Sequence, residues 1–505
     1  MGGLANLPFL VILAGVGAAA MYVPAAMAYT LDQHRVGQAF FYSGTLFLML
    51  AVMVAIATAH RRPRDVVRRH LAQMLGAYLL LPPMLAVPFA QAVPDTSFAN
   101  AWFEMVSAFT TTGATLYTVP GRLPDPVQLW RALAGWMGGF FILLTAAAIL
   151  APVNLGGFEV LSPQAAGRGI RAGRQITDVA DPAERLWHHA RVILPAYGGA
   201  TVALWMALHL AGEGSLIALC HAMATVSTSG ISPVQGLAGG SAGFPGEALV
   251  FLGLMLAVTR RFWPGAVLRA GAPPLWRDPE VRLAAGFVTA IPALLFLRHW
   301  IGAIEGAAPD DPASALEVLW GAVFTVLSFL TTTGFESQGW IDARIWSGLE
   351  APGLLLLGLA IMGGGVATTA GGVRLLRVYA LFEHGRRELE KLSYPSSVGG
   401  GGARLRHLRE DGAWMAFIFF MLFALTLGAV NLALALAGLE FETALILSIA
   451  ALTTTGPLAG VAAEAPVAWS GQGAAAQAVL AATMVIGRFE TLALLALIAP
   501  GAWRR

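Results

Sequence analysis

Residues 109–114 read Phe-Thr-Thr-Thr-Gly-Ala, and three later stretches of the chain nearly repeat them. The later copies are Val226-Ser227-Thr228-Ser229-Gly230-Ile231, Leu330-Thr331-Thr332-Thr333-Gly334-Phe335 and Leu452-Thr453-Thr454-Thr455-Gly456-Pro457. A serine or alanine also stands six positions before each glycine. Four matching segments in one chain indicate four copies of one structural unit, and this repeat decides the fold. We call residues 110–113, 227–230, 331–334 and 453–456 tips 1 to 4.

Each tip ends a short apolar segment that lies between two longer ones. A helix needs about 20 apolar residues to cross the hydrocarbon of a bilayer. The stretches that we expect to cross are 8–30, 38–59, 71–92, 127–153, 192–212, 246–268, 283–302, 349–373, 413–438 and 474–500. The segments at 99–112, 215–229, 315–333 and 442–455 are too short or too interrupted, which is typical of re-entrant or buried helices. The order is a leading pair of spans, followed four times by span, short segment and span.

The composition agrees with this pattern. Of 505 residues, 57% are hydrophobic and 12% are charged, and the mean hydropathy is +0.68. An ordinary soluble domain has roughly 25% charged residues. These values exclude a soluble enzyme, a disordered chain and a nucleic-acid binder, and they indicate an all-α polytopic membrane protein. The single cysteine, Cys220, excludes an intrachain disulfide.

The distribution of positive charge predicts the orientation. Most of the 31 Lys and Arg residues lie at 61–69, 154–191, 260–282, 374–409 and the C-terminus. Because positive loops stay in the cytoplasm, we expect both termini inside and the four short segments entering from outside. The opening apolar run follows no basic patch, so we expect it to remain as the first membrane helix. Ala26-Met27-Ala28 looks like a cleavage site, and removal of this helix is the alternative.

The residue types of the tips predict their chemistry. Glycine permits backbone angles that turn carbonyls inward, and Ser and Thr add hydroxyl oxygens without bulk. Four such tips around one axis would form rings of neutral oxygens that replace the hydration shell of a cation. Neutral rings suit a monovalent ion, whereas Ca²⁺ or Mg²⁺ would require carboxylates. The alternative is that Thr and Gly only end helices and pack them closely. The candidate ion-binding residues are Thr111, Thr112, Gly113, Thr228, Ser229, Gly230, Thr332, Thr333, Gly334, Thr454, Thr455 and Gly456.

The four span–tip–span units resemble the Trk/Ktr/HKT superfamily of potassium transporters, and the Thr-Thr-Thr-Gly ends look like its filter loops. The two leading spans are most similar to the bacterial Trk branch. This resemblance implies pseudo-four-fold symmetry around one pore, potassium as the transported ion and a place in the bacterial inner membrane. It also implies that glycine at position 113 goes with potassium selectivity. The expected divisions are a leading region at 1–69 and repeats at 70–158, 159–272, 273–392 and 393–505.

The run from Gly363 to Arg374 reads GGGVATTAGGVR and resembles the superfamily's intramembrane gate. Five glycines in ten residues weaken a helix, and irregular backbone at membrane depth is tolerated beside a wet cavity. The alternative is close helix packing through small residues. The superfamily usually has a small-Ser-Thr step and a Lys here, where this chain has Ala367-Thr368-Thr369 and Arg374. The candidate gate residues in this run are Gly363, Gly364, Gly365, Thr368, Thr369, Gly371, Gly372 and Arg374.

The last expected span contains Gly487-Arg488-Phe489-Glu490, which matches the superfamily's Gly-Arg-x-Glu. An arginine at mid-membrane costs roughly 2.5–3.5 kcal/mol on insertion scales, so Arg488 should face protein or water. The resemblance places it below the filter, where it would oppose cations as part of the gate. The alternative is a structural ion pair. Glu490 would point elsewhere on a regular helix, toward another helix.

Three further features remain open at this level. Glu104 stands nine residues before Gly113 and either attracts cations at the mouth or caps a helix. His221, nine residues before Gly230, is expected to be a packed side chain. Arg260 and Arg261 interrupt the expected span 246–268, and nothing in the sequence explains them.

The resemblance implies a homodimer in the lipid bilayer and a cytosolic, ring-forming, nucleotide-binding regulator of the TrkA type. The basic loops at 154–191 and 374–409 either dock this regulator or only satisfy the orientation rule. The alternative functions are a sodium- or proton-coupled symporter, which needs a titratable group on the path, and a sodium-permeable pore. A membrane enzyme would need an intramembrane dyad such as Ser/Lys, and we find none clustered at membrane depth.

Overall fold

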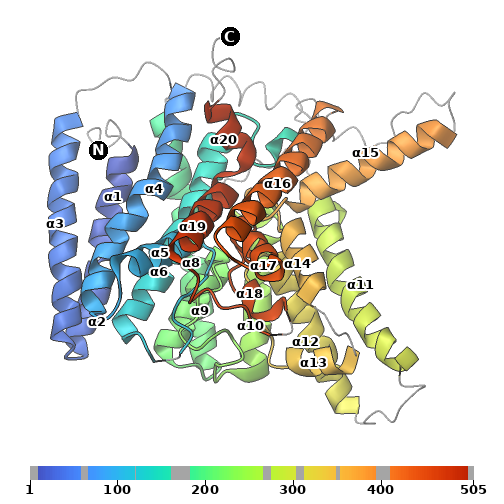
Figure 1. Ribbon diagram of the computed structural model, residues 1–505, viewed down its shortest axis with the longest axis horizontal. Helices are drawn as coiled ribbons and strands as arrows, with labels where there is room; N and C mark the ends of the chain where they lie inside the picture. Colours follow the sequence, from blue (N-terminus) through green and yellow to red (C-terminus); the bar gives the residue numbers. More distant parts are fainter. Residues whose placement is uncertain are drawn as a thin grey trace.

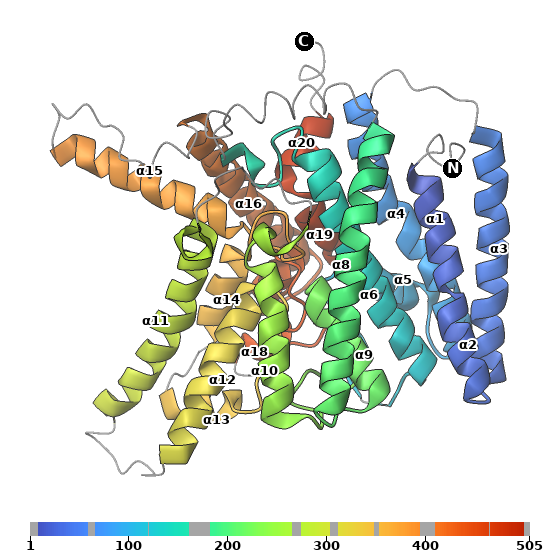
Figure 2. The same ribbon diagram turned by 180° about the vertical axis from the view of Figure 1, so that it is seen from behind.

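The computed structural model describes residues 9–58, 66–119, 121–160, 182–264, 274–302, 312–347, 353–393, 410–463 and 465–498. These residues form helices joined by loops, and they contain no β-strand. Figures 1 and 2 show long helices around a centre that is filled by shorter ones. The start of α1 and the end of α20 lie on the same side of the molecule.

The leading region is a helical hairpin that packs beside the first repeat. Its elements are α1 (Phe9–Ala20), α2 (Tyr22–Thr30) and α3 (His34–Thr58). The expected span 8–30 therefore bends at Met21, between α1 and α2. One side of α3 leaves large apolar side chains such as Met53 and Ile56 exposed, as a helix does when lipid covers it.

The four repeats follow in the expected order of long, short and closing helix. Repeat 1 contains α4 (Val66–Ala92), α5 (Phe98–Phe109) and α6 (Asp125–Thr145), and repeat 2 contains α8 (Pro182–Leu210), α9 (Ser215–Ser227) and α10 (Gly243–Leu254). Repeat 3 contains α11 (Pro279–Gly302), α12 (Pro312–Leu330) and α14 (Gly353–Met362), and repeat 4 contains α16 (Glu410–Leu436), α17 (Phe441–Leu452) and α19 (Ala474–Phe489). Each short helix ends where its tip begins.

The remaining helices and turns connect these units. The connecting helices are α13 (Trp340–Ser347), α15 (Leu375–Ser393), α18 (Leu458–Val461) and α20 (Thr491–Ile498). The helical turns are η2 (Ala146–Leu150), η3 (Phe158–Val160), η4 (Met255–Ala257), η5 (Arg260–Phe262) and η6 (Leu275–Arg277). In Figure 1, α15 projects sideways from the body on the side where the chain ends lie.

Three expected spans are interrupted, and there the prediction of continuous helices is wrong. Seven helices among the described residues are long and apolar enough to cross a membrane. The shorter ones include the closing helices of repeats 2, 3 and 4, at 243–257, 353–362 and 474–489. The chain leaves helical geometry at Gly363, with φ +72°, and at Glu490, with φ +66°. All three interruptions coincide with charged or glycine-rich sequence.

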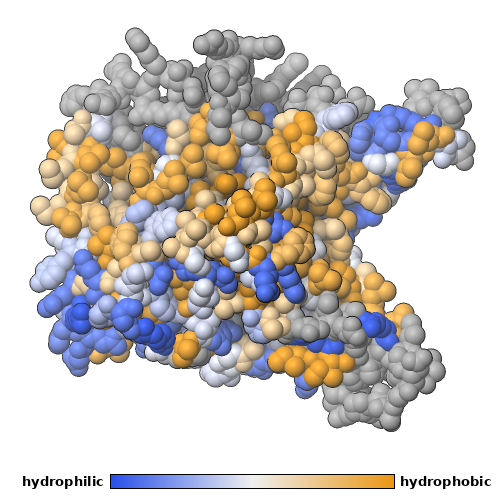
Figure 3. Space-filling view, viewed as in Figure 1, coloured by the Kyte–Doolittle hydropathy of each residue, from blue (hydrophilic) through white to orange (hydrophobic). Residues whose placement is uncertain are grey.

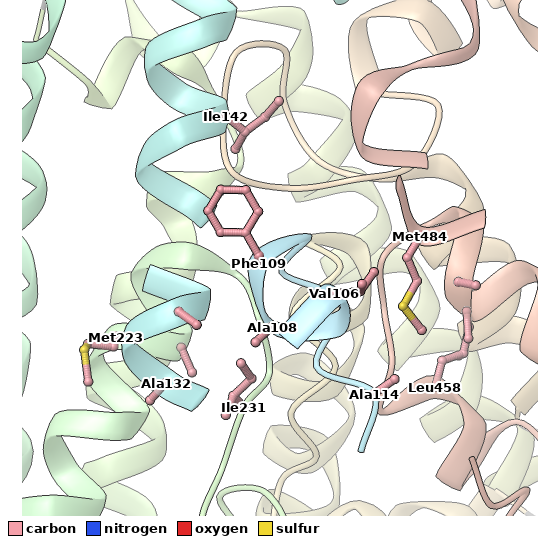
Figure 4. Packing of buried hydrophobic residues seen from close by; sticks show 14 of the residues in the cluster. Val106, Ala108, Phe109, Ala114, Ala132, Ile142, Met223, Ile231, Leu458 and Met484 are labelled. Atoms are coloured by element: carbon pink, nitrogen blue, oxygen red, sulfur yellow. The ribbon is translucent and has the colours of Figure 1, made fainter. Parts of the chain in front are cut away.

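The centre of the fold is built on α5. The Phe109 ring lies 5.5 Å from that of Tyr78 in α4 and 5.7 Å from that of Phe141 in α6. Figure 4 shows Phe109 near Ile142, with Met484 of α19 on another side of α5. A methyl group on Gly138 would overlap the Phe109 carbonyl, so α6 packs directly against the end of α5. This packing fixes where tip 1 begins.

The surface separates an apolar body from a polar edge. Figure 3 shows apolar side chains over the middle and upper part of this face. Hydrophilic side chains gather along the lower edge, around the turn between α2 and α3. This distribution is typical of a protein whose body lies in a bilayer.

Candidate cation filter and gate

The four tips share one backbone structure. Their second residues all have positive φ, between +52° and +58°, and they are Thr111, Thr228, Thr332 and Thr454. The N–H of the third residue donates to the carbonyl of the small residue five positions earlier over 2.8–2.9 Å; the pairs are Thr112–Ser107, Ser229–Ala224, Thr333–Ser328 and Thr455–Ala450. The small residues noted in the sequence are therefore the acceptors that turn each tip.

The first hydroxyl of each tip is already used by its own helix. It donates to the carbonyl four residues earlier; the donors are Thr110, Ser227, Thr331 and Thr453, at 2.7–2.9 Å. The same hydroxyl also contacts the hydroxyl of the third residue, at 2.8–3.2 Å. These first residues therefore hold the tips in shape, and their hydroxyls are already engaged.

The tips meet one another in a closed ring, although they lie far apart in the sequence. Gly113 lies against the carbonyl of Ser229, and Gly230 lies against the carbonyl of Thr333. The N–H of Gly456 donates to the carbonyl of Thr112 over 2.6 Å. Gly334 packs against Pro457, which completes the ring between tips 3 and 4. The structure thus brings all twelve candidate ion-binding residues together.

Glycine is required at the first of these contacts. Gly113 has φ +73°, and a methyl group on it would overlap the Ser229 carbonyl oxygen. A larger residue would therefore push tip 2 away and would also strain tip 1.

Polar side chains behind the ring hold the segments that follow the tips. The Glu104 carboxylate accepts from the Leu116 N–H at 2.5 Å and from Arg131 Nε at 2.9 Å. Both expectations for Glu104 are wrong, because it is buried and paired rather than free at the mouth or solvated at a helix start. His221 is packed as expected, and its Nε2 lies 2.9 Å from Ser232 Oγ. These side chains tie the pore-side backbone to the scaffold.

Two positive side chains of the expected outer side have acidic partners. Arg131 pairs with Glu104, and the exposed Arg122 pairs with Asp95. The hydrogen bond from Arg122 lowers the pKa of the Asp95 carboxyl. The positive charges of these two arginines are therefore locally balanced.

The run 363–374, here called the glycine-rich loop, lies directly against the underside of the ring. Its Gly371 N–H donates to Thr332 Oγ1 at 2.7 Å, and Thr369 Oγ1 donates to the Val226 carbonyl at 3.2 Å. A methyl group on Gly371 would overlap the Thr453 carbonyl. The loop thus contacts repeats 2, 3 and 4 at once.

The loop is closed on itself and anchored from the side. The N–H groups of Val373, Arg374 and Leu375 donate to the carbonyls of Ile361, Met362 and Gly364 at 2.9 Å. Thr368 Oγ1 donates to the Gly365 carbonyl at 2.7 Å, and Arg374 Nη1 donates to the same oxygen at 3.0 Å. Gly363 and Gly372 have positive φ and lie against each other where the loop begins and ends. All eight candidate gate residues of the run therefore belong to one compact loop.

Glu280, at the start of α11, is the lateral anchor, and it also explains the double arginine. Its carboxylate accepts from the Val366 N–H at 2.7 Å. Arg260 lies 3.6 Å from Glu280, and Arg261 lies 3.5 Å from Asp278. The arginines therefore follow the end of a short helix and bind the start of the next repeat, rather than crossing lipid.

Arg488 lies between the glycine-rich loop and tip 1. Its side chain is 2% exposed, and its Nη1 donates to the Ala370 carbonyl at 3.1 Å. Its Nη2 contacts the Thr369 carbonyl and Thr111 Oγ1. None of the ion pairs among the described residues includes Arg488, so the structural ion pair is not what holds it. Arg488 is therefore a buried positive charge beside the ring that no carboxylate of the described residues pairs with.

Glu490 takes part in a separate buried cluster. The chain turns at this residue, so α19 and α20 form two helices rather than one span. Glu490 lies 2.9 Å from Arg377 and 3.8 Å from Arg374, which confirms that it partners another helix. Arg377 also pairs with Glu159 at 2.6 Å, and its guanidinium lies 3.7 Å from the Phe419 ring centre. The cluster joins the end of the glycine-rich loop to repeats 2 and 4.

The sequence does not indicate that three of the charged residues around the glycine-rich loop have a role there. Glu159, Glu280 and Arg377 are ordinary charged residues near expected helix ends, and only folding brings them to the glycine-rich loop. Their burial, at 3%, 0% and 0% exposed, distinguishes them once the structure is known.

Comparisons with known proteins agree with this arrangement. Residues 288–502 match the TrkH family model, described as cation transport protein. The chain is 30% identical over 419 residues to the Trk system potassium uptake protein TrkH of Vibrio parahaemolyticus, covering 81% of each chain. It is 28% identical over 488 residues to the protein of that name from Escherichia coli K12, covering 96% of each. The crystal structure of the potassium transporter TrkH from Vibrio parahaemolyticus matches with a TM-score of 0.76, at 25% identity and 99% coverage of both chains.

The fold and the ring of tips define an all-helical membrane transport protein rather than an enzyme. The chain belongs to the TrkH family of potassium uptake proteins.

Proposed function

We propose that this protein takes up potassium through a filter formed by the four tips and that the glycine-rich loop and Arg488 gate the path. The observation that carries this proposal is the closed ring of tips, with the loop packed directly beneath it. The named relatives are potassium uptake proteins, which supports potassium as the cargo.

The filter would act through neutral oxygens. The carbonyls of Thr112, Ser229 and Thr333 lie at the contacts between tips, where an ion on the axis would meet them. No carboxylate lies within the tips, and the nearby Glu104 faces the scaffold. Rings of neutral oxygen favour an ion that gives up its water readily, and potassium is such an ion.

The gate would act by position and by charge. In this conformation the loop bonds to Thr332 and Val226, so an ion leaving the ring would meet loop backbone. Arg488 adds a buried positive charge at the same place, which repels a cation at short range. Passage requires the loop to move, and Gly363 and Gly372 stand at its two ends as natural hinges.

The proposal also covers the cellular membrane, the orientation of the chain and the boundaries of its repeats. We place the protein in the bacterial inner membrane with both termini in the cytoplasm. The basic loops support this orientation, and the described chain ends lie on one side of the molecule. The divisions at 1–69, 70–158, 159–272, 273–392 and 393–505 each enclose one leading region or one tip-bearing unit.

Two partners belong to the same proposal, a second copy of the chain and a cytosolic nucleotide-binding regulator of the TrkA type. The projecting helix α15 exposes Phe382, Leu389 and Leu392, at 66%, 66% and 79%, which supports packing against another protomer. The word "system" in the names of the relatives supports a further component. Parts of the basic loops, at 161–181 and 394–409, lie outside the described residues.

The direct test is growth of a potassium-uptake-deficient bacterium at micromolar to low-millimolar potassium. The wild-type chain with its regulator is expected to restore growth, and Gly113→Ser is expected to lose most of this rescue, because the new side chain overlaps the Ser229 carbonyl. Gly236→Ser is the matched control, since Gly236 also has positive φ, at +96°, but faces open space. It is expected to grow like wild type.

Failure of the wild-type chain to restore growth, despite normal abundance in the membrane, would contradict the proposal. Sodium competition and an imposed proton gradient in the same cells separate the alternatives. A coupled symporter would stop without its coupling gradient, and a sodium-permeable pore would be inhibited by equal sodium.

A further inference from the structure

The fourth tip is held in place differently from the other three. In repeats 1 to 3, the side chain nine positions before the tip glycine bonds to the segment after the tip; these side chains are Glu104, His221 and Thr325. Repeat 4 has Leu447 at this position, which offers no polar atom. Its anchor is Trp469, whose indole Nε1 donates to the Gly456 carbonyl at 3.1 Å.

The contact between the Trp469 indole and the Gly456 carbonyl is buried. The Trp469 side chain is 5% exposed, and its ring lies 6.2 Å from that of Phe103 in α5. The indole, which belongs to repeat 4, therefore packs against α5, the short helix of repeat 1. Because buried carbonyls without a donor are costly, the indole and Gly456 hold each other firmly.

The anchor changes what Gly456 presents to the ring. Gly456 is the one tip glycine without a positive φ; Gly113, Gly230 and Gly334 have values of +73°, +63° and +80°. Its carbonyl accepts from the Trp469 indole, whereas no side-chain donor is seen on the carbonyls of the other three tip glycines among the described residues. Its N–H donates to the Thr112 carbonyl at 2.6 Å. The backbone of tip 4 thus turns differently from that of the other three at its last residue, Gly456.

Pro457 directly follows this turn and lies at the contact between tips 3 and 4. At the other three contacts, a carbonyl of one tip lies against the glycine of its neighbour. Between tips 3 and 4, the Pro457 ring takes this place and packs against Gly334. The proline ring also approaches Gly230 of tip 2, so it lies against tips 2 and 3 together.

We propose that Trp469 sets the discrimination between potassium and sodium by anchoring tip 4 in this turned position. The inference rests on the proposed function and adds a positioning residue that lies outside the ion path. While Trp469 bonds to Gly456, Pro457 keeps tips 2 and 3 at a fixed separation. Without this bond, tip 4 is free to follow a smaller ion inward, and sodium is excluded less well.

The test is Trp469→Phe, which removes the indole donor and keeps an aromatic ring against Phe103. Uptake of potassium is measured at increasing sodium, with membrane abundance determined for each variant. The sodium concentration for half inhibition is expected to fall by about threefold to tenfold, the size that one neutral hydrogen bond supports. Trp130→Phe is the matched control, because this buried indole also donates to a carbonyl, that of Leu85 at 3.1 Å, but packs beside Phe40 of α3.

A Trp469→Phe variant with normal abundance and unchanged sodium inhibition overturns the inference, and so does an equal shift in Trp130→Phe. Pro457→Ala is the second variant and is expected to shift sodium inhibition in the same direction. If Trp469→Phe fails to reach the membrane, unchanged inhibition in Pro457→Ala overturns the inference by itself. Loss of potassium uptake by the wild-type chain would instead refute the proposed function.

Discussion

Replacing Arg488 by glutamine is expected to raise potassium uptake by at least about tenfold in the absence of the regulator. The guanidinium is buried beneath the ring and has no carboxylate partner among the described residues. Two unit charges about 4 Å apart repel by roughly 4 kcal/mol at an effective dielectric of about 20, and 1.4 kcal/mol corresponds to about tenfold. Glutamine keeps an amide that can donate to the loop carbonyls but removes the charge.

The measurement is rubidium or potassium flux into liposomes that contain the purified protein, normalised to the amount inserted. Arg488→Lys is the matched control, because it keeps the charge and is expected to stay close to wild type. A glutamine variant that folds normally but conducts no faster than wild type would show that the charge is not a barrier.

Replacing Arg377 by methionine is expected to produce the largest loss of stability. Arg377 is fully buried and pairs with Glu159 at 2.6 Å and Glu490 at 2.9 Å. Its removal leaves Glu159 without a cation and Glu490 with only the longer contact to Arg374. Breaking a buried pair in this way costs about 3–5 kcal/mol. The expected result is a large drop in the thermal unfolding temperature in detergent, or loss of folded protein.

Two variants make this result specific. Arg386→Met removes an arginine of the same helix, α15, whose pair with Glu390 is exposed, and it is expected to leave stability nearly unchanged. The double change of Arg377→Met and Glu159→Gln removes the carboxylate that would be left without a cation, keeps Glu490 for Arg374, and should recover part of the loss. Equal destabilisation by Arg377→Met and Arg386→Met would contradict the role assigned to the buried cluster.

The sequence predicts the tips well because each tip is a local structure. The turn at Thr111 depends on the carbonyl of Ser107 and on Gly113, and all three are close in the chain. The same local pattern recurs in each repeat, so its repetition is visible without the fold. Composition and charge likewise predict the membrane class, because lipid imposes one requirement on every span.

The sequence does not predict the contacts that act across repeats. Glu280 reaches Val366, and Arg377 reaches Glu159 and Glu490, over separations that no local pattern records. The end of α19 at Glu490 was likewise invisible, since the surrounding residues are apolar enough for one continuous span. Such interruptions depend on buried partners in other repeats, and these are known only after folding.

The most direct test of the central claim is a structure of the protein with thallium or rubidium, in which anomalous scattering locates the ion. The account predicts a peak on the axis of the ring, within reach of the carbonyls of Thr112, Ser229 and Thr333. An ion bound elsewhere in the membrane region, with the ring empty at saturating concentration, would contradict it.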